Sequence, residues 1–413
     1  MASNSFNTTP NGTTVVDVSG VIGLSTTLVL DSTSTPYIDN ILVLNPTITT
    51  FIFRPGTYRI INIFKILHPN IKFVGYTGVA RDVMILQTMN HDGILVSSDS
   101  IVLQDISIKC TFSQKVTLTV SSANNTLVSG CWLYCSSDTF GIYYAGPSTL
   151  TAGQPTLDAY NAYNLDTGNI FYNNIVYTNY TGDSVSFCLQ YNSQFVKNFI
   201  RGGKAAIYMC RTCNVYNNTI VDSNSNGLFI SLPSDNLTIT CNKIYNSTYS
   251  GLVAKDQLEH GSFTRYSYNI IINYNTIFGS KFYGIELNNG TDVVVTNNKV
   301  VAGKLMGIYS YNGANVLIES NKIAYFTYGV FLENNTGGDV KSNDIMSIYP
   351  NFGQNGIKLT NTTTNVTINN NNMDGMYQFD LIANSGSGNT VSSNNITPNY
   401  TMTDEKNIYK ILG

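Results

Sequence analysis

The chain has 413 residues, of which 43% are hydrophobic and only 11% are charged, and its formal net charge is −3. The apolar fraction is sufficient for a folded core, so the composition excludes a disordered polymer. Charge this scarce and balanced argues against a nucleic-acid partner, because phosphate neutralisation requires clustered Lys and Arg. No apolar run approaches the roughly eighteen residues of a membrane span, and we expect none.

The first segment, residues 1–40, is expected to be an N-terminal segment and cap. Its start, MASNSFNTTPNGTT, has neither the basic residues nor the apolar stretch of a signal peptide. We therefore expect either a mature chain or one that reaches its destination by another route, as virion proteins do.

Residues 41–397 contain a repeat that is marked by Asn, any residue, and then Ile or a related residue. The marker begins at Asn173, Asn198, Asn218, Asn242, Asn275, Asn298, Asn321, Asn343, Asn371 and Asn394. Most copies lie about 23 residues apart, which is a period typical of a solenoid.

A second marker, a small residue followed by an aliphatic one, keeps step with the first. It occurs at Ala206, Gly227, Gly251, Gly284, Gly307, Gly329 and Gly356. Alternating stretches such as DVVVTNNKV indicate strands, and Asn and Gly indicate the tight turns between them. One unit cannot bury its inner face alone, whereas copies stacked at about 4.8 Å per rung can. The sequence therefore predicts an all-β fold, a single-stranded right-handed parallel β-helix of about 12 or more coils.

The stretch FRPGTYRI, Phe53 to Ile60, resembles the opening coil of the pectin lyase-like superfamily. The resemblance covers roughly residues 40–397 and extends to the short parallel β-helix repeats of that group. It implies the fold. It leaves the function open, because the superfamily includes lyases, hydrolases, epimerases, phage tailspikes and non-enzymatic binders.

The repeated asparagines are expected to hydrogen-bond to one another in a column rather than to bind a ligand. The seven cysteines include the pair Cys210 and Cys213, whose spacing also suits a redox or metal site, although small buried core residues fit better. The histidines, His68, His91 and His260, are far apart in the sequence. We therefore predict no metal site and no cofactor.

Three insertions interrupt the repeat, near 135–169, 253–268 and 347–355. Insertions in a solenoid collect on loops, often on a binding face. The tail, 398–413, is expected to cap the last coil or to contact a partner, with a homotrimer as the candidate assembly.

Alternation after the second marker predicts which side chains point outward. The first outward positions are Tyr208, Phe229, Val253, Glu286, Tyr309, Phe331 and Lys358, and the second include Ser231, Lys255, Asn288, Tyr311 and Glu333. Aromatic rings beside polar groups suit sugars. The predicted ligand-binding residues are Glu286, Tyr309, Tyr311, Phe331, Glu333, Phe229 and Tyr208.

The insertion at 253–268 concentrates charge, and its candidate catalytic residues are Lys255, Asp256, Glu259, His260 and Arg265. In a uronate lyase or epimerase, Arg265 or Lys255 would neutralise the sugar carboxylate, and His260 or Tyr266 would act as base or acid. A glycosidase would instead need two carboxylates about 5–10 Å apart, drawn from Asp256, Glu259 and Glu286. The motifs of polygalacturonases, alginate epimerases and pectate lyases do not occur in the chain.

The sequence favours a non-enzymatic protein at an extracellular or virion surface that binds a polysaccharide or surface glycan. Sequons such as Asn179 and Asn236 permit glycosylation. A polysaccharide-active enzyme is the first alternative. A purely structural virion or surface component is the second.

Overall fold

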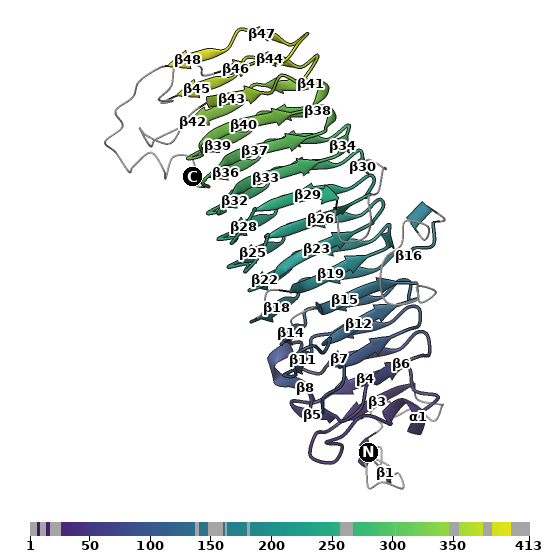
Figure 1. Ribbon diagram of the computed structural model, residues 1–413. Coiled ribbons are helices and arrows are strands. Elements are labelled where there is room, and N and C mark those ends of the chain that lie inside the picture. Colours follow the sequence, from purple (N-terminus) through teal and green to yellow (C-terminus); the bar gives the residue numbers. More distant parts are fainter. Residues whose placement is uncertain are drawn as a thin grey trace, which may run out of the picture. The chain divides into compact units, whose positions relative to one another are not determined.

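The computed structural model describes residues 26–136, 140–147, 160–161, 163–179, 182–256, 267–301, 303–346, 355–374 and 382–397, and the backbone of two short strands before them. The chain divides into two compact units, Met1–Gly203 and Lys204–Gly413. It is an all-β parallel solenoid of about 14 turns, with about 24 residues per turn and almost no helix. This confirms the predicted fold class. A regular turn contributes one short strand to each of three parallel sheets, here called A, B and C in chain order (Figure 1).

In the unit Met1–Gly203, sheet A contains β3 (Thr27–Leu30), β4 (Thr50–Phe53), β7 (Lys72–Gly75), β10 (Val102–Gln104), β13 (Leu127–Ser129), β17 (Ile170–Tyr172) and β21 (Gln194–Val196). Sheet B contains β5 (Gly56–Ile60), β8 (Val83–Gln87), β11 (Ser107–Cys110), β14 (Trp132–Cys135), β18 (Ile175–Thr178) and β22 (Phe199–Arg201). Sheet C contains β6 (Phe64–Ile66), β9 (Ile94–Val96), β12 (Leu118–Ser121), β15 (Phe140–Gly146) and β19 (Asp183–Cys188).

Several short elements accompany these sheets in the same unit. They are the antiparallel pair β1 (Phe6–Thr8) and β2 (Thr14–Val16), the parallel pair β16 (Asp166–Thr167) and β20 (Gln190–Tyr191), the helix α1 (Ile41–Leu44) and the 3-10 helix η1 (Ala80–Asp82).

In the unit Lys204–Gly413, sheet A contains β24 (Asn214–Tyr216), β27 (Thr238–Thr240), β30 (Ser267–Tyr268), β31 (Ile271–Asn273), β34 (Gly290–Thr291), β35 (Val294–Thr296), β38 (Ala314–Glu319), β41 (Thr336–Lys341), β44 (Thr367–Asn369) and β47 (Thr390–Ser392). Sheet B contains β25 (Thr219–Val221), β28 (Lys243–Tyr245), β32 (Thr276–Phe278), β36 (Lys299–Val301), β39 (Lys322–Ala324), β42 (Asp344–Met346), β45 (Asn372–Asp374) and β48 (Asn395–Thr397). Sheet C contains β23 (Lys204–Tyr208), β26 (Leu228–Leu232), β29 (Leu252–Asp256), β33 (Tyr283–Asn288), β37 (Met306–Tyr311), β40 (Tyr328–Glu333), β43 (Asn355–Leu359) and β46 (Ile382–Asn384).

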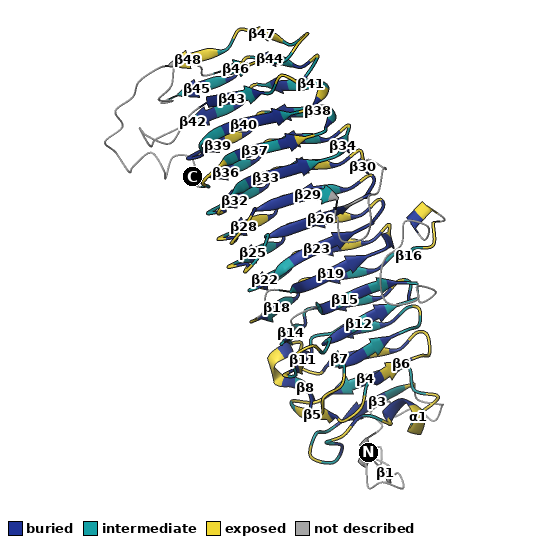
Figure 2. Ribbon diagram, in the orientation of Figure 1, coloured by how far each residue is buried: buried dark blue, intermediate teal, exposed yellow. Residues whose placement is uncertain are grey.

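The core of each unit is built from the inward-pointing residues of most strands. Figure 2 shows buried residues along the strands of all three sheets. In β8, for example, Val83, Ile85 and Gln87 are buried, and the residues between them are partly exposed. Since side chains alternate across a strand, one apolar column per sheet fills the interior.

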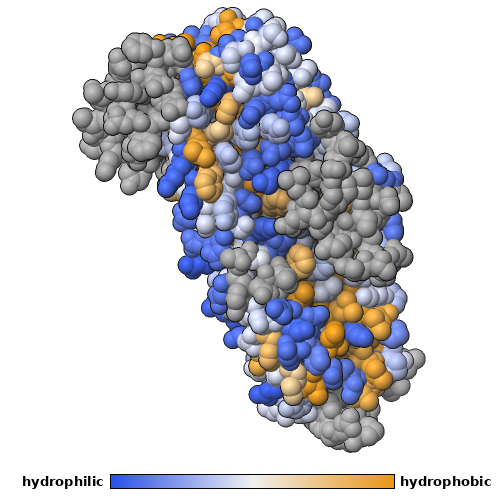
Figure 3. All heavy atoms as spheres, in the orientation of Figure 1, coloured by the Kyte–Doolittle hydropathy of each residue, from blue (hydrophilic) through white to orange (hydrophobic). Residues whose placement is uncertain are grey.

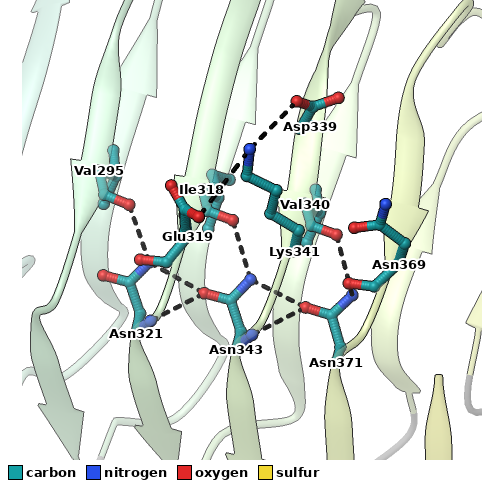
Figure 4. Close-up of polar contacts among 10 residues, drawn as sticks. All are labelled: Val295, Ile318, Glu319, Asn321, Asp339, Val340, Lys341, Asn343, Asn369 and Asn371. Carbon is teal, nitrogen blue, oxygen red and sulfur yellow. Dashed lines mark hydrogen bonds and ion pairs between the residues drawn. The ribbon is translucent and has the colours of Figure 1, made fainter. Parts of the chain in front are cut away.

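A column of asparagines runs along the start of sheet B (Figure 4). Asn321 Nδ2 donates to the carbonyl oxygen of Val295 at 2.8 Å and to Asn343 Oδ1 at 3.0 Å. Asn343 repeats both bonds, to Ile318 and to Asn371. The column joins Asn218, Asn242, Asn275, Asn298, Asn321, Asn343, Asn371 and Asn394 in one unit, and Asn174 and Asn198 in the other. This confirms the predicted column of hydrogen-bonded asparagines.

The first copy of the marker was assigned one residue too early. The column residue is Asn174, whereas Asn173 precedes it with a φ of 54°. Other residues directly before column asparagines also have positive φ, among them Lys197, Asn217, Cys241 and Asn297. Asn adopts this left-handed backbone readily. Because Asn173 and Asn174 are the same residue type, the sequence alone did not show which of the two belongs to the column.

All seven cysteines are free, and all except Cys241 are buried. No helix in the described ranges is long and apolar enough to cross a bilayer. The predicted tail at 398–413 and most of the predicted insertions at 253–268 and 347–355 lie outside the described residues, as do 137–139, 148–159 and 162 of the insertion at 135–169. The predicted domain boundaries therefore stay predictions.

Candidate functional site

The outer side of sheet C in the unit Lys204–Gly413 contains most of the predicted site residues. The pairing registers place Val253, Glu286, Tyr309, Phe331 and Lys358 side by side in consecutive strands. A second column, two residues further along each strand, contains Asn288, Tyr311 and Glu333. Ile285 and Leu287 alternate with these positions and are buried. The two columns therefore point away from the core.

The predicted position of Tyr208 in the first column is wrong. Leu228 pairs with Ala205, Phe229 pairs with Ala206, and Tyr208 pairs with Ser231 in the second column. The error arose because Ala205 and Ala206 are both small. In the next strand the marker glycine, Gly227, precedes Leu228, and the equivalent position before Ala205 is occupied by Lys204. This strand therefore has no small residue at the marker position, and Ala206, two residues too late, was taken for it.

The two aromatic residues at the start of this face are not open to solvent. Phe229 is 4% exposed and Tyr208 is 8% exposed. Their rings pack together with centroids 5.8 Å apart, and Lys204 Nζ lies 4.9 Å from the centroid of the Phe229 ring. These contacts leave little ring surface for the ligand contact that was predicted for both residues.

Glu286 is a buried carboxylate surrounded by donors. Ser250 Oγ donates to its Oε2 at 3.1 Å, and Lys255 Nζ and Asn288 Nδ2 each donate to its Oε1 at 3.3 Å. Its side chain is 9% exposed, whereas the side chain of Lys255 is 36% exposed. The carboxylate is compensated by an ion pair and hydrogen bonds, as a buried charge requires. The Lys255 side chain therefore remains partly exposed beside the buried carboxylate.

Tyr309 and Glu333 form the second polar pair. The Tyr309 hydroxyl donates to Glu333 Oε2 at 2.7 Å. Burial raises the pKa of Tyr309, and the hydrogen bond to Glu333 raises it further. Tyr283 stacks on Tyr309 with centroids 5.3 Å apart, and burial followed by the charges of Glu286 and Glu333 raises its pKa. Both phenols therefore stay protonated near neutral pH and act as donors rather than bases.

The aromatic row continues to a lysine. The Phe331 ring lies 5.6 Å from Tyr309 and 5.5 Å from Tyr328. Lys358 Nζ lies 4.7 Å from the Tyr328 centroid and 4.9 Å from the Phe331 centroid. We call Glu286, Tyr309, Tyr311, Phe331, Glu333 and Lys358 the glutamate–tyrosine face. The surface over β33, β37 and β40 is mainly blue and white in Figure 3, as expected for polar residues and tyrosines.

The predicted catalytic residues are only partly described. Lys255 pairs with Glu286, and Asp256 ends β29 with its side chain outside the description. Glu259, His260 and Arg265 lie outside the described residues. Within the described ranges, no group of three or more His, Cys, Asp or Glu side chains is arranged to hold a metal ion.

Sequence reasoning missed three residues of this site. Ser250, Tyr283 and Tyr328 contact Glu286, Tyr309 and Phe331, respectively. Each stands directly before a marker glycine. The signal was therefore present in the repeat, one position before the marker glycine and three positions before the first outward column.

A cavity of about 290 Å³ lies elsewhere, in the unit Met1–Gly203. Residues of β3, α1 and the segment after β5 line it, including Leu28, Ile41 and Asn62. None of the predicted site residues lines this cavity, so it carries no part of the candidate site.

Comparisons with known proteins agree with this architecture. A family model described as a right handed beta helix region matches residues 153–300 and 234–345. A search of curated proteins finds no match. The matched residues, 153–345 taken together, are similar to right-handed β-helix regions, which agrees with the parallel solenoid described above.

Solved structures share the fold at low sequence identity. The A-module of mannuronan C-5 epimerase AlgE6 from Azotobacter vinelandii is 16% identical, with a TM-score of 0.55 over 85% of this chain and 91% of that one. The AlgE4 A-module from the same organism is 14% identical, with a TM-score of 0.52 over 83% and 91%. Pre-mature gene product 12 of bacteriophage phi29 is 12% identical, with a TM-score of 0.54 over 86% of this chain and 54% of that one. At such identities the likeness concerns the fold alone.

Proposed function

We propose that the glutamate–tyrosine face binds a polysaccharide or surface glycan, and that the protein acts at an extracellular or virion surface. The observation that carries the proposal is the pairing of Tyr309 with Glu333 beside the half-exposed ring of Tyr311. Carboxylates and phenols together accept and donate the hydrogen bonds that sugar hydroxyls make, and aromatic rings pack against their C–H surfaces.

The repeat geometry supports an extended ligand. Glu286, Tyr309, Phe331 and Lys358 lie in four consecutive rungs, which repeat at about 4.8 Å. Glu286 and Phe331 are only 7% and 8% exposed, whereas Tyr309 and Lys358 are partly exposed. A linear glycan running across the strands would therefore meet Tyr309 and Lys358, together with Tyr311 and Glu333 of the second column. Lys255 and Lys358 at the two ends of the row suit a ligand that carries some negative charge.

A glycan-binding panel tests this proposal. We expect the wild-type chain to bind at least one neutral or acidic polysaccharide, and Glu333→Gln and Tyr311→Ala to weaken that binding. Tyr268→Ala is the matched control, because Tyr268 is 40% exposed in sheet A and Tyr311 is 37% exposed in sheet C. Equal binding by all four proteins would refute the proposal, and an absence of binding would favour a purely structural role.

A second candidate function is uronan modification. The observation that favours it is the ion pair of Lys255 with Glu286, at the point where the segment containing His260 and Arg265 begins. Two proteins of similar fold are mannuronan C-5 epimerases. Such enzymes require a cation beside the sugar carboxylate and a group that removes the adjacent proton.

Turnover assays separate the enzyme from the binder. Mannuronan and polygalacturonate are incubated with the protein while unsaturated uronates, reducing ends and exchange of the C5 hydrogen with solvent are followed. Turnover that is abolished by His260→Ala or Arg265→Gln would establish the enzyme. Binding without turnover, unchanged in His260→Ala, would contradict it.

A further inference from the structure

The outer side of sheet B in the unit Met1–Gly203 carries a second aromatic cluster, which none of the functions above uses. Trp132 pairs with Ile175, and Tyr134 pairs with Tyr177, in the adjacent strands β14 and β18. Leu133 and Val176 alternate with these residues and are completely buried. The aromatic side chains therefore point outward, and Trp132, Tyr134 and Tyr177 are all partly exposed.

The rings form one continuous group across three strands. Trp132 lies 6.2 Å from both Tyr134 and Tyr177, measured between centroids. Tyr134 and Tyr177 stack at 5.7 Å with an interplanar angle of 17°, and Phe199 on β22 lies 6.3 Å from Tyr177. This packing fixes the rings in place.

Cations surround the rings. The Arg81 guanidinium carbon lies 4.6 Å from the Trp132 ring centroid, and Lys109 Nζ lies 6.0 Å from the Tyr134 centroid. The registers place Arg59 at one end of the Tyr134 column and Arg201 at the other. We call Trp132, Tyr134, Tyr177, Arg59, Arg81, Lys109 and Arg201 the tryptophan platform.

Three of the platform's cations, Arg59, Arg81 and Lys109, carry positive charge without an opposing carboxylate in the described part of the chain. The two outward columns of sheet B from β5 to β22 contain no acid: Thr57, Met84, Ser107, Trp132, Ile175 and Phe199 in one, and Arg59, Leu86, Lys109, Tyr134, Tyr177 and Arg201 in the other. Within the described part of the chain, Arg59, Arg81 and Lys109 form no ion pair. Asp82, which follows Arg81, instead accepts a hydrogen bond from Thr77 Oγ1 at 2.7 Å.

Arg81 is held over the tryptophan by the fold. It lies in η1, where Ser107 Oγ donates to the carbonyl oxygen of Ala80 at 2.9 Å. Ser107 itself pairs with Trp132 across the sheet. The hydrogen bond therefore ties the turn carrying Arg81 to the strand next to Trp132. One face of a guanidinium in this position packs on the ring. Its N–H groups can still donate hydrogen bonds to a planar anion.

We propose that the tryptophan platform binds an acidic polysaccharide whose sugars carry carboxylates. Guanidinium and ammonium groups pair with carboxylates through charge-assisted hydrogen bonds. The hydroxyls of Tyr134 and Tyr177 supply donors and acceptors for sugar hydroxyls. The cations and phenols recur along the rungs of one sheet, which suits a polymer with a regular repeat of charge.

Single-stranded nucleic acid fits the platform less well. Proteins that bind it stack successive bases on open aromatic faces. Here Tyr134 and Tyr177 stack on each other, and Arg81 lies over Trp132. These contacts occupy ring faces, while hydroxyls and cations remain at the edges.

Intrinsic fluorescence tests the proposal directly, because Trp132 is the single tryptophan of the chain. Polygalacturonate is titrated into the full-length protein, with dextran, dextran sulfate and a single-stranded oligonucleotide as separate arms. We expect a saturable change in Trp132 emission with polygalacturonate that weakens as salt is added. No response, an equal response to dextran, or a stronger response to dextran sulfate or the oligonucleotide would each overturn the proposal.

Charge variants provide the second measurement. Arg81→Gln and Lys109→Gln are each expected to lower the affinity for polygalacturonate about tenfold, as loss of one charge-assisted hydrogen bond implies. Lys65→Gln, an exposed lysine of sheet C in the same unit, is the matched control and should leave the affinity unchanged. Because Arg81→Gln changes the environment of Trp132, calorimetry measures the variants, and a retained thermal midpoint verifies folding. Unchanged affinity in both variants would overturn the proposal.

The Trp132 fluorescence change reports on the tryptophan platform alone, because the glutamate–tyrosine face contains no tryptophan. Glu333→Gln should leave the Trp132 response unchanged even if it abolishes binding elsewhere. A Trp132 response that disappears in Glu333→Gln would contradict the assignment of a separate site.

Discussion

At the scale of single residues, the asparagine column shows how one side chain satisfies several buried groups. Asn321 Nδ2 donates to a carbonyl group and to Asn343, and Asn321 Oδ1 accepts from the backbone and side chain of Asn298. An unpaired buried donor or acceptor costs about 1–3 kcal/mol. The column is therefore a structural necessity of the turn and is not available to a ligand.

We expect Asn321→Ala to lower the free energy of unfolding by about 3 kcal/mol, since it leaves several of these groups unpaired. Asn62→Ala, at an exposed position, should change it by less than about 0.5 kcal/mol. Urea unfolding measures both. Similar stabilities for the two variants would show that the column is dispensable.

Asp166 gives a residue-scale prediction of pH dependence. It is 3% exposed, and burial raises its pKa to about 7. The folded state then binds a proton between pH 4 and pH 7 that the unfolded state has released. The stabilisation from the neutral carboxyl group is thus complete below about pH 4 and is lost as the pH rises towards 7, at up to about 1.4 kcal/mol per pH unit.

Asp166→Asn should remove this pH dependence, because an amide cannot ionise. We therefore expect the wild-type free energy of unfolding, relative to that of the variant, to fall from pH 4 to pH 7. Unfolding curves at four pH values measure the difference. A constant difference across the range would contradict the raised pKa.

At the scale of the strand, the glycines of sheet C explain the small residue in the second marker. A Cβ atom on Gly307 would lie 2.3 Å from Ile323 Cγ2 and 2.6 Å from the carbonyl oxygen of Gly329. A Cβ atom on Gly284 or on Gly329 would meet the equivalent neighbours, which in each case lie one turn further along the chain. The marker thus records a close approach between the start of each sheet C strand and the next strands of sheets B and C along the chain.

We expect Gly307→Ala to lower the free energy of unfolding by about 2 kcal/mol or more, because backbone atoms have to move. Gly78→Ala is the control. A Cβ there meets no atom within 4 Å, although its φ of 71° carries a backbone cost of about 1 kcal/mol. Denaturant unfolding compares the two, and an equal or smaller loss for Gly307→Ala would refute the close-approach explanation.

The sequence was sufficient for the strands and for most of the glutamate–tyrosine face, because columns recur at nearly constant spacing. The sequence prediction placed Tyr208 in the wrong column, because either of the adjacent residues Ala205 and Ala206 could be taken as the small residue of the marker. It missed the tryptophan platform because Trp132 pairs with Ile175, 43 residues later. The chain between β14 and β18 is longer than one regular repeat. A search for partners about 23 residues apart therefore does not find this pair.

At the scale of the whole molecule, the fold supplies a regular scaffold, and function depends on what its outer columns carry. A solenoid of about 14 turns presents the same backbone positions at every rung. The same architecture is found in epimerase modules and in a phage protein. The arrangement of Glu286, Tyr309, Glu333 and Lys358, rather than the fold, is therefore the basis of the proposed glycan binding.

The most direct test of that claim is the affinity of Tyr309→Phe for the glycan that binds wild-type protein best, measured by calorimetry. The substitution keeps the stacked ring and removes only the hydroxyl that donates to Glu333. We expect the affinity to fall about fivefold, as loss of one hydrogen bond implies, with an unchanged thermal midpoint. Wild-type affinity in both Tyr309→Phe and Tyr311→Ala would contradict glycan binding at this face.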